Sequence, residues 1–144
     1  MKSPAPIDAT LSSRAEPMAR LEAVIDRAAE EYGLPYDLVT NLRIAMDEVV
    51  SNILKYAYSD DAGHDIAIRC EIRDGRLETT VEDDGCAFDP LEAPAPQLDV
   101  PLDQRKVGGL GIHMVKELMD GVSYERIGGR NRLTLKQDLP GGAQ

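Results

Sequence analysis

The feature that most constrains the fold of this chain is a long apolar stripe between Pro35 and Tyr58. Within this segment, apolar residues recur at spacings of three and four, which places them along one side of a single helix. The stripe consists of Leu38, Leu42, Ala45, Val49, Ile53 and Ala57. A helix that is apolar on one side only must bury that side against a second layer of structure.

The segments before this helix predict little more than one further helix. Residues 1–13 are expected to be a loose N-terminus or to hold a short strand at Ile7 to Leu11. A first helix is expected from Glu16 to Tyr32, because its apolar residues also recur at helical spacing and Gly33 provides a stop.

The segments after the stripe supply the second layer. Alternating apolar and polar residues predict a hairpin of two strands that turns at Asp74-Gly75. A third helix and a second hairpin follow, so the expected elements after the stripe are strands at 66–72 and 77–81, a helix at 109–119, and strands at 122–127 and 132–137. This order predicts an α/β (α+β) fold, a two-layer sandwich with helices on one face of a mixed, mostly antiparallel sheet.

The domain organisation expected from these patterns is simple. Residues 14–140 form one domain, and residues 141–144 form a tail. Four prolines interrupt the segment from about 90 to 107, whose length is typical of a lid or a binding loop.

The charge of the chain limits its partners. It has 144 residues with 16 basic and 26 acidic side chains, a formal net charge of −10. Binding to nucleic acid or to an anionic membrane surface is therefore not expected, because both need clustered Lys and Arg. No apolar run approaches the ~20 residues of a membrane span, and the first ten residues lack a secretory pattern, so a cytoplasmic location is the default expectation.

Three short motifs carry the chemistry, and the first lies on the long helix. Glu48 and Asn52 are four residues apart and share a helix side next to the apolar stripe. A carboxamide oxygen is a suitable ligand for Mg²⁺, and a carboxylate one turn away can accept a proton. The alternative is two solvated polar residues on an amphipathic helix.

The second motif follows the first predicted hairpin. Asp83, Asp84 and Gly85 stand where the strand ends and the chain must turn sharply. A buried carboxylate there can accept a hydrogen bond from the exocyclic amine of adenine and exclude guanine. The alternative is an ordinary Asp-Gly turn.

The third motif is a glycine cluster, Gly108, Gly109 and Gly111 with Leu110 between them, which opens the third helix. Glycines before a helix let the backbone approach phosphates, and the first N–H groups of the helix point at the anion. The cluster is neither a Walker A loop nor a dinucleotide fingerprint. The alternative is a hinge before a helix.

The three motifs in this order, with the proline-rich segment between the second and the third, resemble the Bergerat-fold (GHKL) ATPases. Within that superfamily the chain is most similar to the stand-alone anti-sigma-factor serine/threonine kinases of bacterial partner-switching pathways. The resemblance covers Glu16 to Leu139 and includes the ending Gly128-Gly129-Arg130-Asn131-Arg132-Leu133. Ala87 departs from the superfamily pattern, in which a glycine often stands two residues after Gly85.

The resemblance implies roles for the residues of the first two motifs. Asn52 would coordinate Mg²⁺ and Glu48 would be the catalytic base. Lys55 stands where the family often has a basic residue near the phosphates, although a solvated cation is as good a reading. Asp83 would hold the adenine amine, and Gly85 would give the close turn.

The resemblance also implies contacts from the rest of the chain to ATP. Gly108, Gly109, Leu110 and Gly111 would cradle the phosphates. Arg105 and Lys106 would reach the terminal phosphate, unless they are ordinary surface charges on a loop. Thr134, on the last strand, would lie near the adenine.

The function implied is that of an ATP-dependent and Mg²⁺-dependent serine/threonine kinase that acts as an anti-sigma factor. Its partners would be a STAS-type anti-sigma-factor antagonist as substrate and a sigma factor or another regulatory target, and a homodimer is common in the family. Two alternatives stay open. One is a nucleotide-gated binding module that sequesters a non-sigma partner with little or no phosphoryl transfer, and the other is a domain in which the motifs have lapsed.

Overall fold

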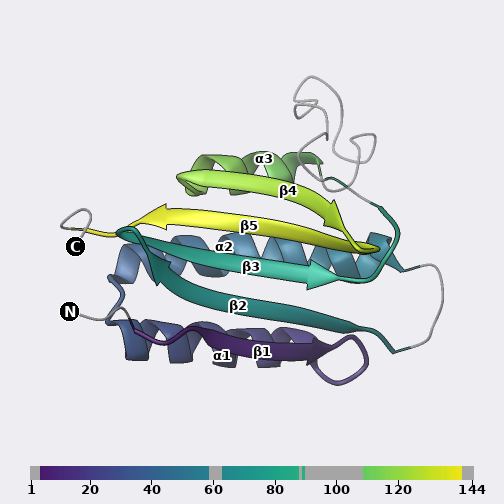
Figure 1. Ribbon diagram of the computed structural model, residues 1–144, viewed down its shortest axis with the longest axis horizontal. Coiled ribbons are helices and arrows are strands. Elements are labelled where there is room, and N and C mark those ends of the chain that lie inside the picture. Colours follow the sequence, from purple (N-terminus) through teal and green to yellow (C-terminus); the bar gives the residue numbers. More distant parts are fainter. Residues whose placement is uncertain (1–3, 59–62, 88, 90–108, 141–144) are drawn as a thin grey trace.

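The computed structural model describes residues 4–58, 63–87, 89 and 109–140. In these residues the helices lie on one face of a sheet, whose other face is open (Figure 1). The elements in chain order are β1 (Ile7–Ser12), α1 (Pro17–Tyr32), α2 (Tyr36–Asn52), the π-helical turn η1 (Ile53–Ala57), β2 (Asp65–Arg73), β3 (Arg76–Asp83), α3 (Gly109–Leu118), β4 (Gly121–Ile127) and β5 (Arg130–Asp138).

The sheet has five strands in the order β1-β2-β3-β5-β4. Each of the four neighbouring pairs is antiparallel. The α+β sandwich expected from the sequence is therefore confirmed, and Ile7–Ser12 is an edge strand of its sheet.

The register of the two central strands decides which side chains face the helices. On β3 the residues that alternate into the core are Leu77, Thr79, Val81 and Asp83, and on β5 they are Asn131, Leu133, Leu135 and Gln137. Val81 pairs with Leu133 and Asp83 pairs with Asn131. The polar pair at the end of this row therefore faces the helical layer beside an aliphatic core.

The turns follow the sequence signals. Gly33 ends α1 with a φ of 60° and donates its backbone N–H to the Ala29 carbonyl. Asp74 and Gly75 both have positive φ, 53° and 75°, as the tight turn between β2 and β3 requires.

The helix expected from Pro35 to Tyr58 has a different end in the structure. Regular α-helix stops at Asn52, and the chain continues as the π-helical turn η1 to Ala57. The apolar stripe remains buried across this change, because Ile53 and Ala57 are still in the core. Single π-helical turns are common near functional sites, and this one begins directly after Asn52.

Candidate functional site

A pocket opens between the sheet and the C-terminal half of the long helix. Its walls come from α2, η1, β3, β4, β5 and α3. Most of its lining is aliphatic, and its polar members are Asn52, Asp83, Tyr124 and Asn131. An apolar slot with a few polar groups is suited to a flat heteroaromatic ligand.

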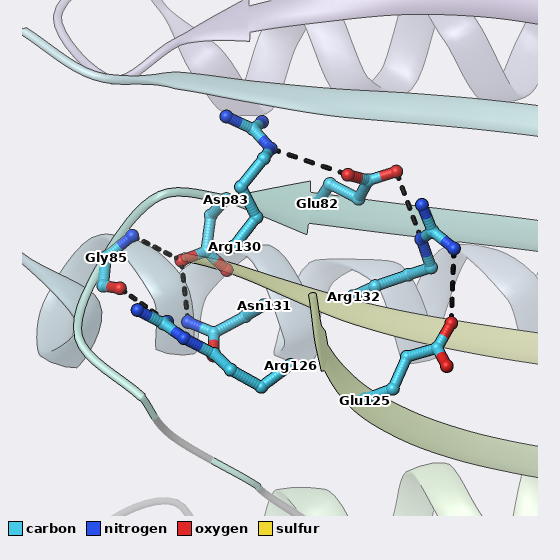
Figure 2. Close-up of polar contacts among 8 residues, drawn as sticks. All are labelled: Glu82, Asp83, Gly85, Glu125, Arg126, Arg130, Asn131 and Arg132. Atoms are coloured by element: carbon cyan, nitrogen blue, oxygen red, sulfur yellow. Dashed lines mark hydrogen bonds and ion pairs between the residues drawn. The ribbon is translucent and has the colours of Figure 1, made fainter. Parts of the chain in front are cut away.

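Asp83 lies at one end of the pocket, where β3 ends, and is only 3% exposed. Its Oδ1 accepts a hydrogen bond from the Gly85 backbone N–H at 2.9 Å and another from Asn131 Nδ2 at 3.0 Å. Figure 2 shows these two donors converging on the carboxylate. Among the described residues no donor reaches Oδ2, so this oxygen is available to a ligand in the pocket.

Asn131 is a site residue that the sequence analysis did not single out, although it lies within the motif that carried the resemblance. It is 5% exposed, and its Nδ2 also donates to the Cys86 carbonyl at 2.8 Å. Its Oδ1 accepts from the Tyr124 hydroxyl at 2.5 Å and from Arg126 Nη1 at 3.1 Å. A buried Asn in an otherwise aliphatic strand pattern is the signal that would have identified it.

Gly85 is required by a close approach of two backbones. A Cβ at this residue would lie 2.4 Å from the Ala57 carbonyl oxygen. The next residue, Cys86, donates its backbone N–H to that same oxygen at 2.9 Å. The turn after β3 is thus fixed directly on η1, which sets the distance between the Asp83 end of the pocket and the long helix.

Asn52 lines the same pocket from the last residue of α2 and is 5% exposed. Its side-chain amide has no hydrogen-bond partner within the described ranges. The amide is not among the fully buried unpaired polar atoms of the described residues, so it keeps access to the pocket. Asn52 therefore fits the ligand-binding role expected of it.

Glu48 and Lys55 flank Asn52 without lining the pocket. Glu48 lies one helical turn earlier and is half-buried, and its carboxylate makes no hydrogen bond or ion pair with the described part of the chain. Lys55 lies in η1 and is exposed. Glu48 thus stands one turn before Asn52 on the same helix, as the spacing predicts.

Helix α3 approaches the pocket with its first turn. Gly109, Leu110 and Gly111 are the first three residues of this helix, and Ile112, which follows them, lines the pocket. The N-terminus of a helix attracts anions. Gly108, Arg105 and Lys106, with the lid expected at 90–107, lie outside the described residues.

Thr134 lies on the opposite face of β5 from the residues that line the pocket. Residues 131, 133, 135 and 137 of β5 face the helices, and Thr134 therefore points to the open face, where it pairs with Thr80. The residue of this strand that meets Asp83 is Asn131. Neighbouring residues of a strand face opposite sides of the sheet, so Thr134 does not face the pocket that Asn131 and Leu133 line.

A second polar cluster borders the Asp83 end. The rings of Tyr58 and His64 stack with centroids 4.0 Å apart, and His64 Nδ1 lies 3.3 Å from Asp84 Oδ1. Burial, followed by the nearby Asp83 and Asp84 charges, raises the pKa of Tyr58 far above its ordinary value. Tyr58 therefore stays a neutral phenol, and its hydroxyl has no hydrogen-bond partner in the described structure.

The described residues leave few candidate groups for a metal ion. They contain no group of three or more His, Cys, Asp or Glu side chains placed to hold one. None of the described helices is long and apolar enough to cross a membrane.

Comparison with known proteins agrees with this geometry. Residues 11–137 match the family model of the histidine kinase-like ATPase domain. The chain is 36% identical over 96 residues to the serine/threonine-protein kinase BtrW of Bordetella bronchiseptica, an alignment that spans 65% of this chain and 66% of BtrW. It is 31% identical over 120 residues to the serine-protein kinase RsbW of Bacillus cereus, spanning 81% of this chain and 74% of RsbW.

A solved structure supports the fold. The crystal structure of the RsbU and RsbW domains of a Mycobacterium tuberculosis protein superposes with a TM-score of 0.68 at 18% identity, covering 94% of this chain and 33% of that one. The site and the matches together define the class: the chain belongs to the family of histidine kinase-like ATPase domains. Within that family, the relatives named here are the serine kinases RsbW and BtrW, so the family expected from the sequence is confirmed.

Proposed function

We propose that this protein is an ATP-dependent serine/threonine kinase and anti-sigma factor, which phosphorylates a STAS-type anti-sigma-factor antagonist in a partner-switching pathway. The observation that supports this most is the pocket that holds Asn52 and Asp83 together, with the first turn of α3 at its wall. One pocket thus has a carboxylate for a base, an amide for a phosphate-bound cation and a helix N-terminus for anionic oxygens. The relatives RsbW and BtrW are serine kinases by name, which agrees with the kinase part of this proposal.

Asp83 is the base-recognition residue in this proposal. Its Oδ1 is occupied by Gly85 and Asn131, so Oδ2 is the oxygen that accepts from the exocyclic amine of adenine. Guanine has a carbonyl oxygen at the corresponding position, and two acceptors do not form a hydrogen bond. The apolar walls from Val81, Ile53 and Leu133 cover the faces of the ring.

Asn52 and the nucleotide phosphates would hold Mg²⁺, because Asn52 has the free amide and the described residues offer no carboxylate cluster. When bound, Mg²⁺ neutralises charge that develops on the phosphate oxygens. Backbone N–H groups at the start of α3 would hold the same phosphates.

Glu48 is the base that accepts the proton of the attacking hydroxyl. The hydroxyl oxygen of a Ser or Thr of the antagonist bonds to the γ-phosphorus while the bond to the β,γ-bridging oxygen breaks, and ADP leaves. The position of Glu48, half-buried and one turn before Asn52, supports this role.

The product explains how such a reaction would switch partners. Phosphorylation adds a charge of about −1.5 to −2 to the antagonist. Because this chain has a net charge of −10, the two proteins then repel each other more strongly, and the kinase is released to hold its sigma factor or another regulatory target. We place this cycle in the cytoplasm.

The test is phosphoryl transfer to the antagonist, followed by intact-mass measurement. The wild-type protein with Mg-ATP should raise the mass of the antagonist by about 80 Da, one phosphoryl group. Glu48→Gln should bind ATP normally and transfer at least a hundredfold more slowly, in keeping with the ~10²–10⁴-fold contribution of a general base. Asp47→Asn is the matched control, because Asp47 precedes Glu48 on the same helix and does not line the pocket.

Three outcomes separate the alternatives. Unchanged transfer by Glu48→Gln would remove Glu48 from its role. Tight ATP binding with no mass change on the antagonist would favour the nucleotide-gated binding module that sequesters a non-sigma partner. Absence of ATP binding by the wild type would mean that the motifs have lapsed.

A further inference from the structure

Arg126 lies at the end of the edge strand β4, opposite Asn131 of β5. One of its nitrogens, Nη1, donates to two acceptors: the Gly85 carbonyl oxygen at 2.8 Å and Asn131 Oδ1 at 3.1 Å. Figure 2 shows the guanidinium reaching past Asn131 toward the turn after β3. Arg126 therefore contacts the two residues that donate to Asp83, without contacting Asp83 itself.

The contact with Asn131 acts together with the Cys86 carbonyl, which accepts from Nδ2, to fix the direction of the amide group. An Asn amide can rotate by half a turn, which exchanges its donor and acceptor ends. Arg is always a donor, whereas a Tyr hydroxyl such as that of Tyr124 can donate or accept. On the β4 side, Arg126 requires that Oδ1 face it, whereas Tyr124 does not. This orientation, which the Cys86 carbonyl also favours, directs Nδ2 to Asp83 Oδ1.

The contact with Gly85 fixes the position of the turn. On one side of the turn, the Cys86 N–H donates to the Ala57 carbonyl of η1. On the other side, Arg126 holds the Gly85 carbonyl from β4. Because the Gly85 N–H is itself a donor to Asp83, a turn held from both sides keeps this donor in place.

We propose that Arg126 is a positioning residue for adenine recognition. It orients Asn131 and the Gly85 turn so that both donors occupy Oδ1 of Asp83, which leaves Oδ2 directed at the exocyclic amine of the base. This inference rests on the proposed binding of ATP, but it assigns to Arg126 a specific effect on the choice of base.

The experiment measures base selectivity. Isothermal titration calorimetry gives the affinity of each protein for Mg-ATP and for the Mg complex of purine riboside triphosphate, which lacks only the exocyclic amine. The wild type should prefer ATP by roughly tenfold, the value of one hydrogen bond to a charged group. Arg126→Met should lower this preference to less than threefold by weakening ATP binding, while the affinity for the analogue stays unchanged. Arg126→Lys, which keeps a cationic donor, should restore most of the preference.

The matched control is Arg132→Met. Arg132 belongs to the same hairpin, but it pairs with Glu82 and Glu125 on the open face of the sheet (Figure 2). Its replacement should leave the preference for ATP as in the wild type. If Arg126→Met fails to fold, as judged by circular dichroism, Arg126→Gln carries the same test.

The outcomes distinguish the two proposals. A wild-type preference retained in Arg126→Met would overturn the positioning role. Equal loss of affinity for ATP and for the analogue would also overturn it, because a general disturbance of the pocket does not discriminate between bases. A wild-type protein that binds neither nucleotide would overturn the proposed function itself, and this inference with it.

Discussion

Gly85 lies directly against the carbonyl group of Ala57, so that a Cβ at residue 85 would come within 2.4 Å of that oxygen. This contact joins the turn after β3 to the π-helical end of the long helix. Because both partners are backbone, neither can move aside without displacing its own element.

We therefore expect Gly85→Ala to lower both stability and nucleotide affinity. The displaced turn should cost about 1–3 kcal/mol of unfolding free energy, as other overpacked sites do, and it should weaken ATP binding by moving the Gly85 N–H away from Asp83. Urea unfolding and ATP titration measure the two effects. Gly121→Ala is the control, because a Cβ there meets the Lys136 side chain at an ordinary 3.6 Å. Equal stability of the two variants would contradict the role given to this contact.

The register of β5 predicts opposite results for two of its residues. Asn131→Ala removes a donor from Asp83 and should weaken ATP binding roughly tenfold, the cost of losing a hydrogen bond to a charged group. Thr134→Ala changes the open face of the sheet and should leave ATP affinity as it is. Calorimetric titration of both variants checks this. A larger effect from Thr134→Ala would mean that the nucleotide binds elsewhere.

The two cysteines should differ in reactivity. Cys86 is exposed beside the Asp83 turn, whereas Cys70 is buried. We expect Ellman's reagent to modify Cys86 quickly in the folded protein and Cys70 only after unfolding, because a buried neutral thiol is inert. Saturating Mg-ATP should slow the reaction of Cys86, since the ligand would occupy the adjacent pocket. Rapid modification of Cys70 in the folded state would be at odds with the described core.

Cys70 also predicts how stability changes at alkaline pH. Burial raises the pKa of its thiol from 9.0 to about 11. Between these values the folded protein holds a proton that the unfolded chain has lost, so the stability that this group contributes is complete below pH 9 and is lost as pH rises through 11. The shift in pKa corresponds to a loss of unfolding free energy on the order of 2–3 kcal/mol.

The comparison that isolates this effect is Cys70→Ala. Urea unfolding of the wild type and the variant at pH 8, 9.5 and 11 gives the difference in unfolding free energy at each pH. We expect the wild type to lose its advantage over the variant as the pH rises. A difference that stays constant across these conditions would show that Cys70 does not contribute to the alkaline decline.

The sequence predicted the helices and hairpins well, because each has a strong local signal. The stripe from Leu38 to Ala57 and the Asp74-Gly75 turn are patterns that neighbouring residues determine almost alone. The π-helical turn after Asn52 was not predicted, since its apolar spacing also suits a regular helix. The turn packs against Gly85 through Ala57, a contact between residues far apart in the sequence that no local pattern indicates.

The candidate site was predictable in part for the same reason. Asp83 and Gly85 belong to a turn motif after a strand, and Asn52 borders an apolar helical stripe, so local patterns point to all three. The structure brings Asn52 and Asp83 to one pocket. Asn131 and Arg126 have no such local signature. Their positions follow from the pairing of β5 with β3 and β4, which depends on tertiary structure.

Because Asp83 pairs with Asn131 across β3 and β5, the two side chains come together only when these strands have their native register. A slip of one residue between these strands would turn one of the two side chains toward the open face, since strand residues alternate between faces. A nucleotide that requires both groups would thus bind only the native alignment and lower its free energy relative to shifted ones. ATP would in that way favour accurate assembly of the sheet, in addition to serving as a phosphoryl donor.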